Sequence, residues 1–326
     1  MNERRWARRG RGALVAVVAG IVALTLASLT FNAATTPGRT LDAPGGRDVQ
    51  TSVGRIHYER WGEHGTPVVL VHGFAESTLA WSLTAPELAR HHRVYALDLP
   101  GFGYSEYTGR YTLDDEVAAL AAFLEALDID RPILVGHSMG AGVVGELARR
   151  RPDLVSAVVF ADGDALAFEG RDRPSRAAEV VVGSPYATSA LRLGLRSRWV
   201  RREFFAQACG SVCPAATDEL IDAWVRPMRQ GAAENALRTM ASQPMVAMTP
   251  QQVRQIRVPR GIVWGEEDTT SGGSLDGARG ALGDPPTVVI PDAGHLPVVA
   301  DPKGFAHALE LVIDRMGTLT VEGGEP

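Results

Sequence analysis

The chain has 326 residues, of which 45% are apolar and 22% are charged, a composition typical of a globular protein that can bury a large core. Its formal net charge of −5 argues against nucleic-acid binding as the main task. Its two cysteines exclude a disulfide-built scaffold and a four-cysteine zinc site.

The amino-terminal residues have the pattern of a membrane-targeting segment. Residues 1–12 carry five arginines and one glutamate, and residues 13–31 form an apolar run without charge. As a helix, this run spans about 28 Å, close to the hydrocarbon thickness of a bilayer. A signal anchor, a cleaved signal peptide and a buried helix of the globular domain are the three interpretations. In the first two, the arginines stay in the cytoplasm and the rest of the chain is exported, either membrane-anchored or secreted.

A linker and then an alternating pattern follow. Residues 32–46 are rich in Thr, Pro, Gly and Ala and are predicted to be a linker. Beyond them, β-branched runs alternate with helical stretches, which predicts a mainly parallel sheet with helices on both faces. We expect strands at 47–53, 55–61, 67–71, 93–97, 132–135, 156–161, 261–264 and 287–290, and helices at 79–90, 113–127, 139–150 and 305–316.

The interval 163–258 interrupts this alternation. It is mostly helical by pattern and contains no convincing strand. We therefore expect a helical cap inserted between two parts of one sheet domain, residues 47–162 and 259–316, with residues 317–326 as a tail.

The string Gly136-His137-Ser138-Met139-Gly140 follows a predicted strand and opens a predicted helix. In a sharp strand–turn–helix connection the central serine adopts a strained backbone conformation, and its hydroxyl stands exposed at the carboxyl edge of the sheet. Side chains two positions before and after it would clash, which explains glycine at both places. The alternative is a glycine-rich turn in which Ser138 is an ordinary residue at a helix start.

With these residues, the chain resembles the cap-bearing serine hydrolases of the α/β-hydrolase fold family over roughly residues 50 to 316. The resemblance implies an α/β fold with a mostly parallel eight-stranded sheet, and it implies Ser138 as the nucleophile. Asp268 ends the string WGEED after the seventh strand, where the family usually places the acid. His295 ends the string DAGH after the eighth strand and matches the base. Asp162 and Glu267 are the rivals of Asp268.

The same resemblance places the oxyanion hole. The family takes one donor from the loop after the third strand, here His72-Gly73-Phe74, so the backbone N–H groups of Phe74 and Met139 are the expected donors. His72 is expected to brace this loop, and His137 to pack beside the elbow.

The chemistry explains why these residue types are needed together. A serine hydroxyl is a poor nucleophile at neutral pH, and a histidine within hydrogen-bond reach takes its proton. The imidazolium that forms needs a carboxylate to orient and stabilise it. This mechanism needs no cofactor, and the other histidines show no metal-ligand spacing.

We expect a carboxylesterase that acts on a small or medium acyl ester. Serine at the elbow excludes the relatives that use aspartate there, haloalkane dehalogenases and epoxide hydrolases. A C–C bond hydrolase and a cofactor-free haloperoxidase or perhydrolase on the same triad stay open. A non-catalytic ligand-binding module is the alternative of another class.

Two features of the cap have alternative interpretations. Four methionines, Met228, Met240, Met245 and Met248, either line a flexible apolar pocket or simply pack between helices. Cys209 and Cys213 are four residues apart and either form a disulfide, as an exported protein allows, or remain reduced thiols.

Overall fold

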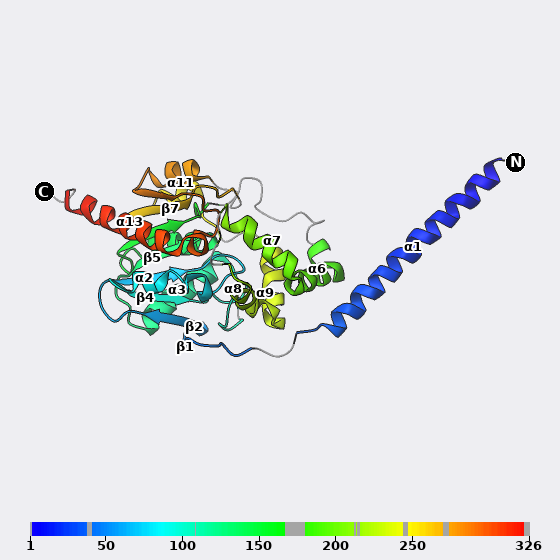
Figure 1. The fold of residues 1–326 in the computed structure, drawn as a ribbon, viewed down its shortest axis with the longest axis horizontal. Helices are drawn as coiled ribbons and strands as arrows, with labels where there is room; N and C mark the ends of the chain where they lie inside the picture. Colours follow the sequence, from blue (N-terminus) through cyan, green and yellow to red (C-terminus); the bar gives the residue numbers. More distant parts are fainter. Residues whose placement is uncertain are drawn as a thin grey trace.

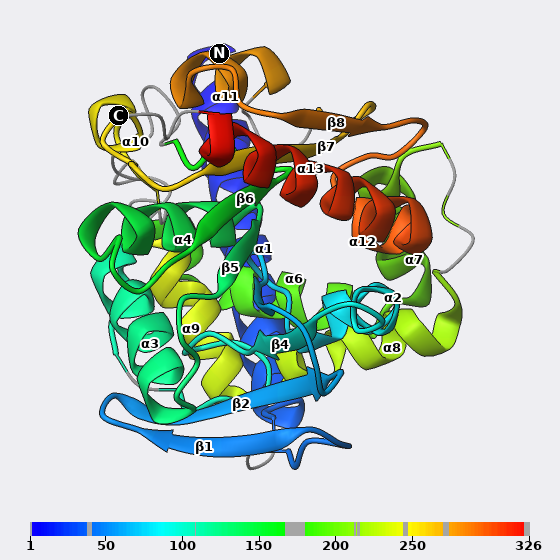
Figure 2. The same ribbon diagram turned by 90° about the vertical axis from the view of Figure 1, so that its left-hand side faces the viewer.

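The computed structural model describes residues 2–37, 41–107, 109–166, 180–211, 213, 216–243, 247–269 and 274–322, with only the backbone for 2–12 and 318–322. Its centre is one eight-stranded sheet of order β1-β2-β4-β3-β5-β6-β7-β8 (Figures 1 and 2). The β1–β2 and β2–β4 pairings are antiparallel and the other five pairings are parallel, which confirms the expected mostly parallel sheet. The strands are β1 Arg47–Thr51, β2 Gly54–Trp61, β3 Pro67–Val71, β4 Arg93–Leu97, β5 Ile133–His137, β6 Ala157–Ala161, β7 Arg260–Gly265 and β8 Thr287–Ile290.

Helices cover both faces of the sheet because the central strands are apolar on both sides. All five residues of β3 are buried, and they alternate between two hydrophobic clusters, Val69 and Val71 in one and Val68 and Leu70 in the other. The first cluster includes residues of α3 (Leu113–Ala126), α4 (Met139–Arg150), α10 (Pro250–Val253) and α11 (Leu275–Leu282). The second includes residues of α2 (Ala85–Leu88), α12 (Pro297–Ala300) and α13 (Pro302–Glu322).

Some elements differ from the sequence-based expectation. The stretch 79–90 is not one helix but a 3-10 turn, η1 Thr78–Trp81, followed by α2. Pro86 explains the break, because proline has no N–H to continue a helix and is favoured in a first turn. The closing helix is longer than 305–316, since Pro302 begins it and its backbone runs to Glu322. Strand β5 extends through His137, two residues beyond the expected 132–135.

Among the described residues between β6 and β7 there are four longer helices, which we call the cap helices. They are α6 Pro185–Arg196, α7 Arg198–Cys209, α8 Asp218–Val225 and α9 Gly231–Ala241, with the short turn η2 Pro227–Arg229 between the last two. Serine or threonine caps three of them, because Ser184, Ser197 and Thr217 accept backbone N–H bonds at the starts of α6, α7 and α8.

The amino-terminal helix α1, Asn2–Ala34, projects away from the globular body (Figure 1). It includes the basic segment, the apolar run and the first residues of the expected linker. Its part Ala13–Ala34 is long and apolar enough to cross a membrane, with a mean hydropathy of 2.4 and only 6% of its most apolar window buried. Its carboxyl-terminal end lies against α6 (Figure 1).

Candidate active site

Ser138 stands on a sharp turn between β5 and α4. Its backbone has φ 50° and ψ −117°, a conformation that costs energy for a residue other than glycine. The two flanking positions have no room for a side chain. A Cβ at Gly136 would lie 2.4 Å from the carbonyl oxygen of Gly140. A Cβ at Gly140 would lie 2.4 Å from the carbonyl oxygen of Val71. The turn therefore has the geometry that the sequence string predicts.

Ser138, His295 and Asp268 form a continuous hydrogen-bonded chain. The Oγ of Ser138 lies 2.9 Å from Nε2 of His295, and Nδ1 of His295 lies 2.8 Å from Oδ2 of Asp268. The Asp268 side chain is buried, whereas His295 keeps 16% of its side chain exposed. One ring nitrogen of His295 thus lies against the serine hydroxyl, and the other is held by the carboxylate of Asp268.

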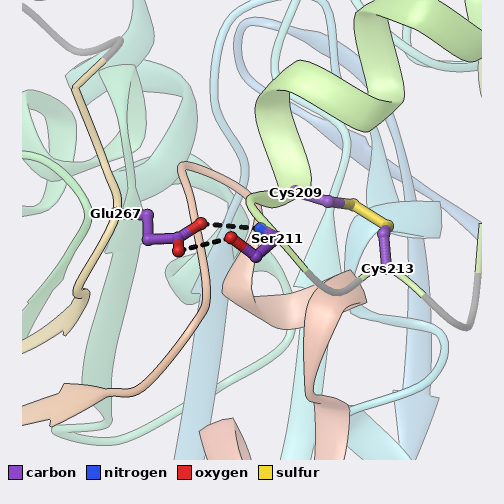
Figure 3. Close-up of a disulfide and its surroundings, with 4 residues drawn as sticks. All are labelled: Cys209, Ser211, Cys213 and Glu267. Carbon is purple, nitrogen blue, oxygen red and sulfur yellow. Dashed lines mark hydrogen bonds between the residues drawn. A yellow bond between two sulfur atoms is a disulfide. The ribbon is translucent and has the colours of Figure 1, made fainter.

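The two rivals of Asp268 lie elsewhere. Asp162 follows β6, is fully buried and accepts a hydrogen bond from the N–H of Gly265 at 2.7 Å. Burial, with the charges of Asp268 and Glu76 nearby, raises the pKa of Asp162 well above its usual value, which favours the neutral form of this carboxyl. Glu267 instead accepts hydrogen bonds from Ser211 (Figure 3).

The predicted oxyanion donors lie on the two loops that meet at Ser138. A Cβ at Gly73 would lie 2.9 Å from Cβ of Ser138, so the loop after β3 passes close to the elbow because Gly73 has no side chain. Met139 is the first residue of α4, where an N–H has no acceptor inside its own helix. Within the described residues, the N–H of Phe74 also donates to no acceptor.

His72 braces this loop, as its sequence position suggests. Burial lowers its pKa, so the ring is neutral and can donate and accept at the same time. Nδ1 donates to the carbonyl of Gly73 at 2.8 Å, and Nε2 accepts from the N–H of Leu99 at 3.0 Å. The ring therefore links the loop after β3 to the loop after β4.

A buried ion pair beneath the site was not expected from the sequence. His137 Nδ1 lies 3.0 Å from the carboxylate of Glu76, and its Nε2 donates to the carbonyl of His295 at 2.7 Å. Burial alone would lower the pKa of His137, but the charge of Glu76 and its hydrogen bond raise it to about 9. Glu76 also accepts the N–H of Gly73 at 2.9 Å. A lone glutamate in a loop is normally solvated, so no sequence signal marked Glu76.

The two cysteines are joined in a disulfide in the loop after α7 (Figure 3). This loop packs against the loop that carries His295, because the N–H of Gly294 donates to the carbonyl of Cys209 at 2.6 Å. The N–H of Leu296 donates in the same way to Ala208 at 2.9 Å. Both chain neighbours of His295 are thus held by the end of α7.

An apolar cavity of about 270 Å³ lies between the cap helices and the loop after β3. Ala75, adjacent to Phe74, and Trp224, whose Nε1 donates to the Ala75 carbonyl at 3.3 Å, are at its inner side. Ser138 is not among the described residues that line it. The lining residues are Ala75, Leu191, Gly194, Leu195, Val200, Arg201, Phe204, Phe205, Trp224, Val225 and Met228.

The cap methionines have different surroundings. Met228 lines the cavity, whereas Met248 is fully buried in the core and Met240 packs partly buried against it. Met245 lies outside the described residues. Helix packing therefore accounts for two of the four.

Comparison with known proteins places the chain in a family. Residues 68–308 match the profile described as "Alpha/beta hydrolase family". The chain belongs to the alpha/beta hydrolase family. This agrees with the sequence-based resemblance and with the sheet described above.

Relatives in this family have diverse names. The match to "Uncharacterized hydrolase YugF" of Bacillus subtilis (strain 168) is 28% identical over 221 residues and covers 65% of this chain and 77% of that protein. A match to "2-hydroxy-6-oxo-2,4-heptadienoate hydrolase" of Pseudomonas putida is 40% identical over 113 residues, but covers only 33% of this chain and 41% of that protein.

Solved structures agree on the fold. "Crystal structure of a membrane phospholipase A, a novel bacterial virulence factor" superposes with a TM-score of 0.67 at 22% identity, covering 96% of this chain and 99% of that chain. At this identity the likeness shows the fold alone. The family supports a hydrolase.

Proposed function

We propose that the protein is a serine hydrolase that cleaves a small or medium acyl ester. The observation that carries this proposal is the continuous hydrogen-bonded chain from Ser138 through His295 to Asp268, with the serine on a strained turn. A serine that only begins a helix needs neither this strained backbone conformation nor a histidine Nε2 at 2.9 Å from its Oγ.

The mechanism follows from the geometry. Ser138 Oγ attacks the ester carbonyl while Nε2 of His295 takes its proton, and Asp268 stabilises the imidazolium. The N–H groups of Phe74 and Met139 are placed to stabilise the oxyanion, and losing one such donor typically costs about 3 kcal/mol of barrier. His295 returns the proton to the departing alcohol, and water activated by the same histidine then releases the acid from the acyl-enzyme.

The apolar cavity favours an acyl ester over a charged substrate. Among the described residues that line it, Arg201 alone is charged, and its guanidinium is paired with Asp222. An uncharged hydrocarbon chain therefore fits the lining better than a carboxylate would. Cleavage of C–C bonds or haloperoxidase chemistry on the same three residues is the alternative, since relatives carry such names.

We further propose that α1 anchors the enzyme in a membrane. Its apolar part reaches the length of a bilayer core, and the arginines before it favour a cytoplasmic amino terminus. The catalytic domain then lies outside the cytoplasm, where the disulfide is stable.

The full chain in detergent should react with a fluorophosphonate probe and hydrolyse p-nitrophenyl esters. Ser138→Ala should abolish both without unfolding the protein. Retained turnover in this variant would reject Ser138 as the nucleophile. Failure of the folded wild-type chain to label would instead favour a non-catalytic ligand-binding module. Diketone and halogenation substrates, assayed in parallel, separate the alternatives on the same triad.

A further inference from the structure

The cap helices expose a set of large apolar side chains to solvent. Trp199 is 72% exposed, Phe204 is 61% exposed and Leu193 is 55% exposed. Large apolar side chains exposed on neighbouring elements are a candidate interaction site, because a contiguous apolar patch on a soluble surface normally marks one. We call this set the cap face; it consists of Leu193, Trp199, Val200 and Phe204 on α6 and α7, together with Val180 and Val181 just before α6.

The transmembrane candidate α1 lies directly against the helix that carries part of this face. The Oγ1 of Thr25 lies 2.5 Å from the hydroxyl of Tyr186 on α6. Further along, Asn32 donates to the carbonyl of Pro185 at 2.8 Å, and its own carbonyl accepts a hydrogen bond from Arg192. These contacts fix α6 beside the last three turns of α1.

This contact sets the depth of the cap face relative to a bilayer. The apolar run of residues 13–31 must be used almost completely to cross a hydrocarbon core of about 30 Å. Thr25 lies well inside that run, yet it contacts Tyr186 of α6. If α1 spans the bilayer, its contact with α6 therefore places α6 at the membrane surface. The helix α6 is then not surrounded by water on all sides.

The chemistry of the cap face fits such a boundary. Tyrosine and tryptophan are the residues that favour the headgroup level, and Tyr186 and Trp199 are both exposed here. Exposed arginines, Arg196, Arg198 and Arg202, lie on the same two helices. Asp218 pairs with the last two and Glu203 is exposed on α7, which leaves a small net positive charge that suits anionic lipid headgroups.

The cap face is continuous with the cavity next to the site. Val200 and Phe204 belong to both the exposed face and the cavity lining. The lining also includes Ala75, the chain neighbour of the oxyanion candidate Phe74. The cavity thus connects the surface nearest α1 with the loop next to Ser138.

We propose that the cap face rests in the headgroup region of the bilayer spanned by α1, and that the acyl chain of a lipid-borne ester enters the cavity from there. This inference rests on the proposed ester hydrolysis and membrane anchoring. It makes a lipid bilayer the partner of the cap helices and a membrane-dissolved acyl ester the substrate.

Membrane contact can be measured on the full chain in phosphatidylcholine–phosphatidylglycerol vesicles. Brominated acyl chains quench tryptophan fluorescence, so Trp199→Phe should lower the quenched fraction relative to wild type. Trp61→Phe is the matched control on β2, and removing a tryptophan that lipid does not reach should raise the quenched fraction. An equal quenched fraction in the two variants would overturn the proposal. Crosslinking between two chains through the cap face would then show that this face binds a second copy of the chain.

Substrate entry is tested by two esters. The double variant Leu193→Gln/Trp199→Gln, which leaves the cavity lining intact, should hydrolyse vesicle-borne p-nitrophenyl palmitate about tenfold more slowly and p-nitrophenyl butyrate at the wild-type rate. Val289→Gln changes an exposed valine on β8 and should affect neither ester.

The outcomes of this assay distinguish a failure of the proposed substrate entry from a failure of the proposed ester hydrolysis. Unchanged palmitate hydrolysis in the double variant, with butyrate turnover that depends on Ser138, would reject entry from the bilayer and leave the esterase proposal standing. A wild-type chain that hydrolyses neither ester would reject the esterase proposal and substrate entry with it, while fluorescence quenching would still decide the membrane contact.

Discussion

Ser211 donates two hydrogen bonds to Glu267, one from its N–H at 2.6 Å and one from its hydroxyl (Figure 3). Glu267 is the chain neighbour of Asp268, and Ser211 lies inside the loop closed by the Cys209–Cys213 disulfide. The same loop holds Gly294, the chain neighbour of His295. One small cap loop therefore contacts the segments that carry both the acid and the base.

Removal of the disulfide should weaken this support. For Cys209→Ser/Cys213→Ser we expect the free energy of unfolding to fall by about 2 kcal/mol, the chain-entropy value for so short a loop. We also expect a several-fold lower kcat with little change in KM, because the loop positions His295 and Asp268 and touches no substrate. Urea unfolding and p-nitrophenyl butyrate kinetics measure the two effects.

Ser211→Ala separates the loop contacts from the covalent bond. It keeps the disulfide and the backbone hydrogen bond to Glu267, and removes only the bond from the hydroxyl. Its kcat should lie between wild type and the double serine variant. A double variant with wild-type kcat and stability would show that the disulfide does not support the site.

The identity of the acid predicts different outcomes at two aspartates. Asp268→Asn should lower kcat by about 10⁴, since an amide leaves the His295 tautomer wrong for accepting the serine proton. Asp162→Asn should change kcat less than tenfold, because the Asp162 side chain accepts from the N–H of Gly265, whereas Nδ1 of His295 lies against Asp268. Steady-state ester kinetics with matched circular dichroism spectra test both, and the reverse order would assign the acid to Asp162.

The parts of the site that sequence could predict are those encoded by local strings. Ser138 follows from a glycine-flanked turn between a strand and a helix, and His295 from its place after the last strand. Parallel strands bring their carboxyl ends to one edge, so these residues had to meet once the alternating pattern was recognised. The same logic predicted the eight strands, with errors of a few residues at their ends.

The parts that sequence could not predict depend on contacts between distant segments. Glu76 becomes important only because His137 lies beneath the loop after β3. Gly163 looks like any glycine after a strand, yet a Cβ there would meet the elbow. The contact of α1 with α6 joins residues that lie 161 positions apart in the chain, and no periodicity of the sequence predicts it.

The buried His137–Glu76 pair predicts a pH dependence of stability. His137 has a pKa raised from 6.5 to about 9, so its contribution is complete below pH 6.5 and is lost as the pH rises toward 9. Glu76 has a lowered pKa, so its contribution is present above pH 4.5 and is lost in acid below that. The free energy of unfolding should therefore fall by about 3 kcal/mol between pH 6 and pH 9.5.

Glu76→Gln provides the control for this dependence. The amide can still accept a hydrogen bond but removes the charge that holds the proton on His137. Urea unfolding of this variant should show a lower free energy at pH 6 and a much flatter profile up to pH 9.5. Parallel profiles for the variant and wild type would mean that the pair does not cause the dependence.

The close approach of Gly163 to the elbow gives a final test of how the strained serine is held. A Cβ at Gly163 would lie 2.5 Å from the carbonyl oxygen of Ser138, so Gly163→Ala must displace the turn. We expect at least a tenfold loss of kcat and slower fluorophosphonate labelling, because a shift near 1 Å at a reacting atom costs about 100-fold. Gly280→Ala, in open space on α11, should keep full activity and gain up to about 1 kcal/mol in stability. Wild-type labelling rates in Gly163→Ala would show that the elbow tolerates the displacement.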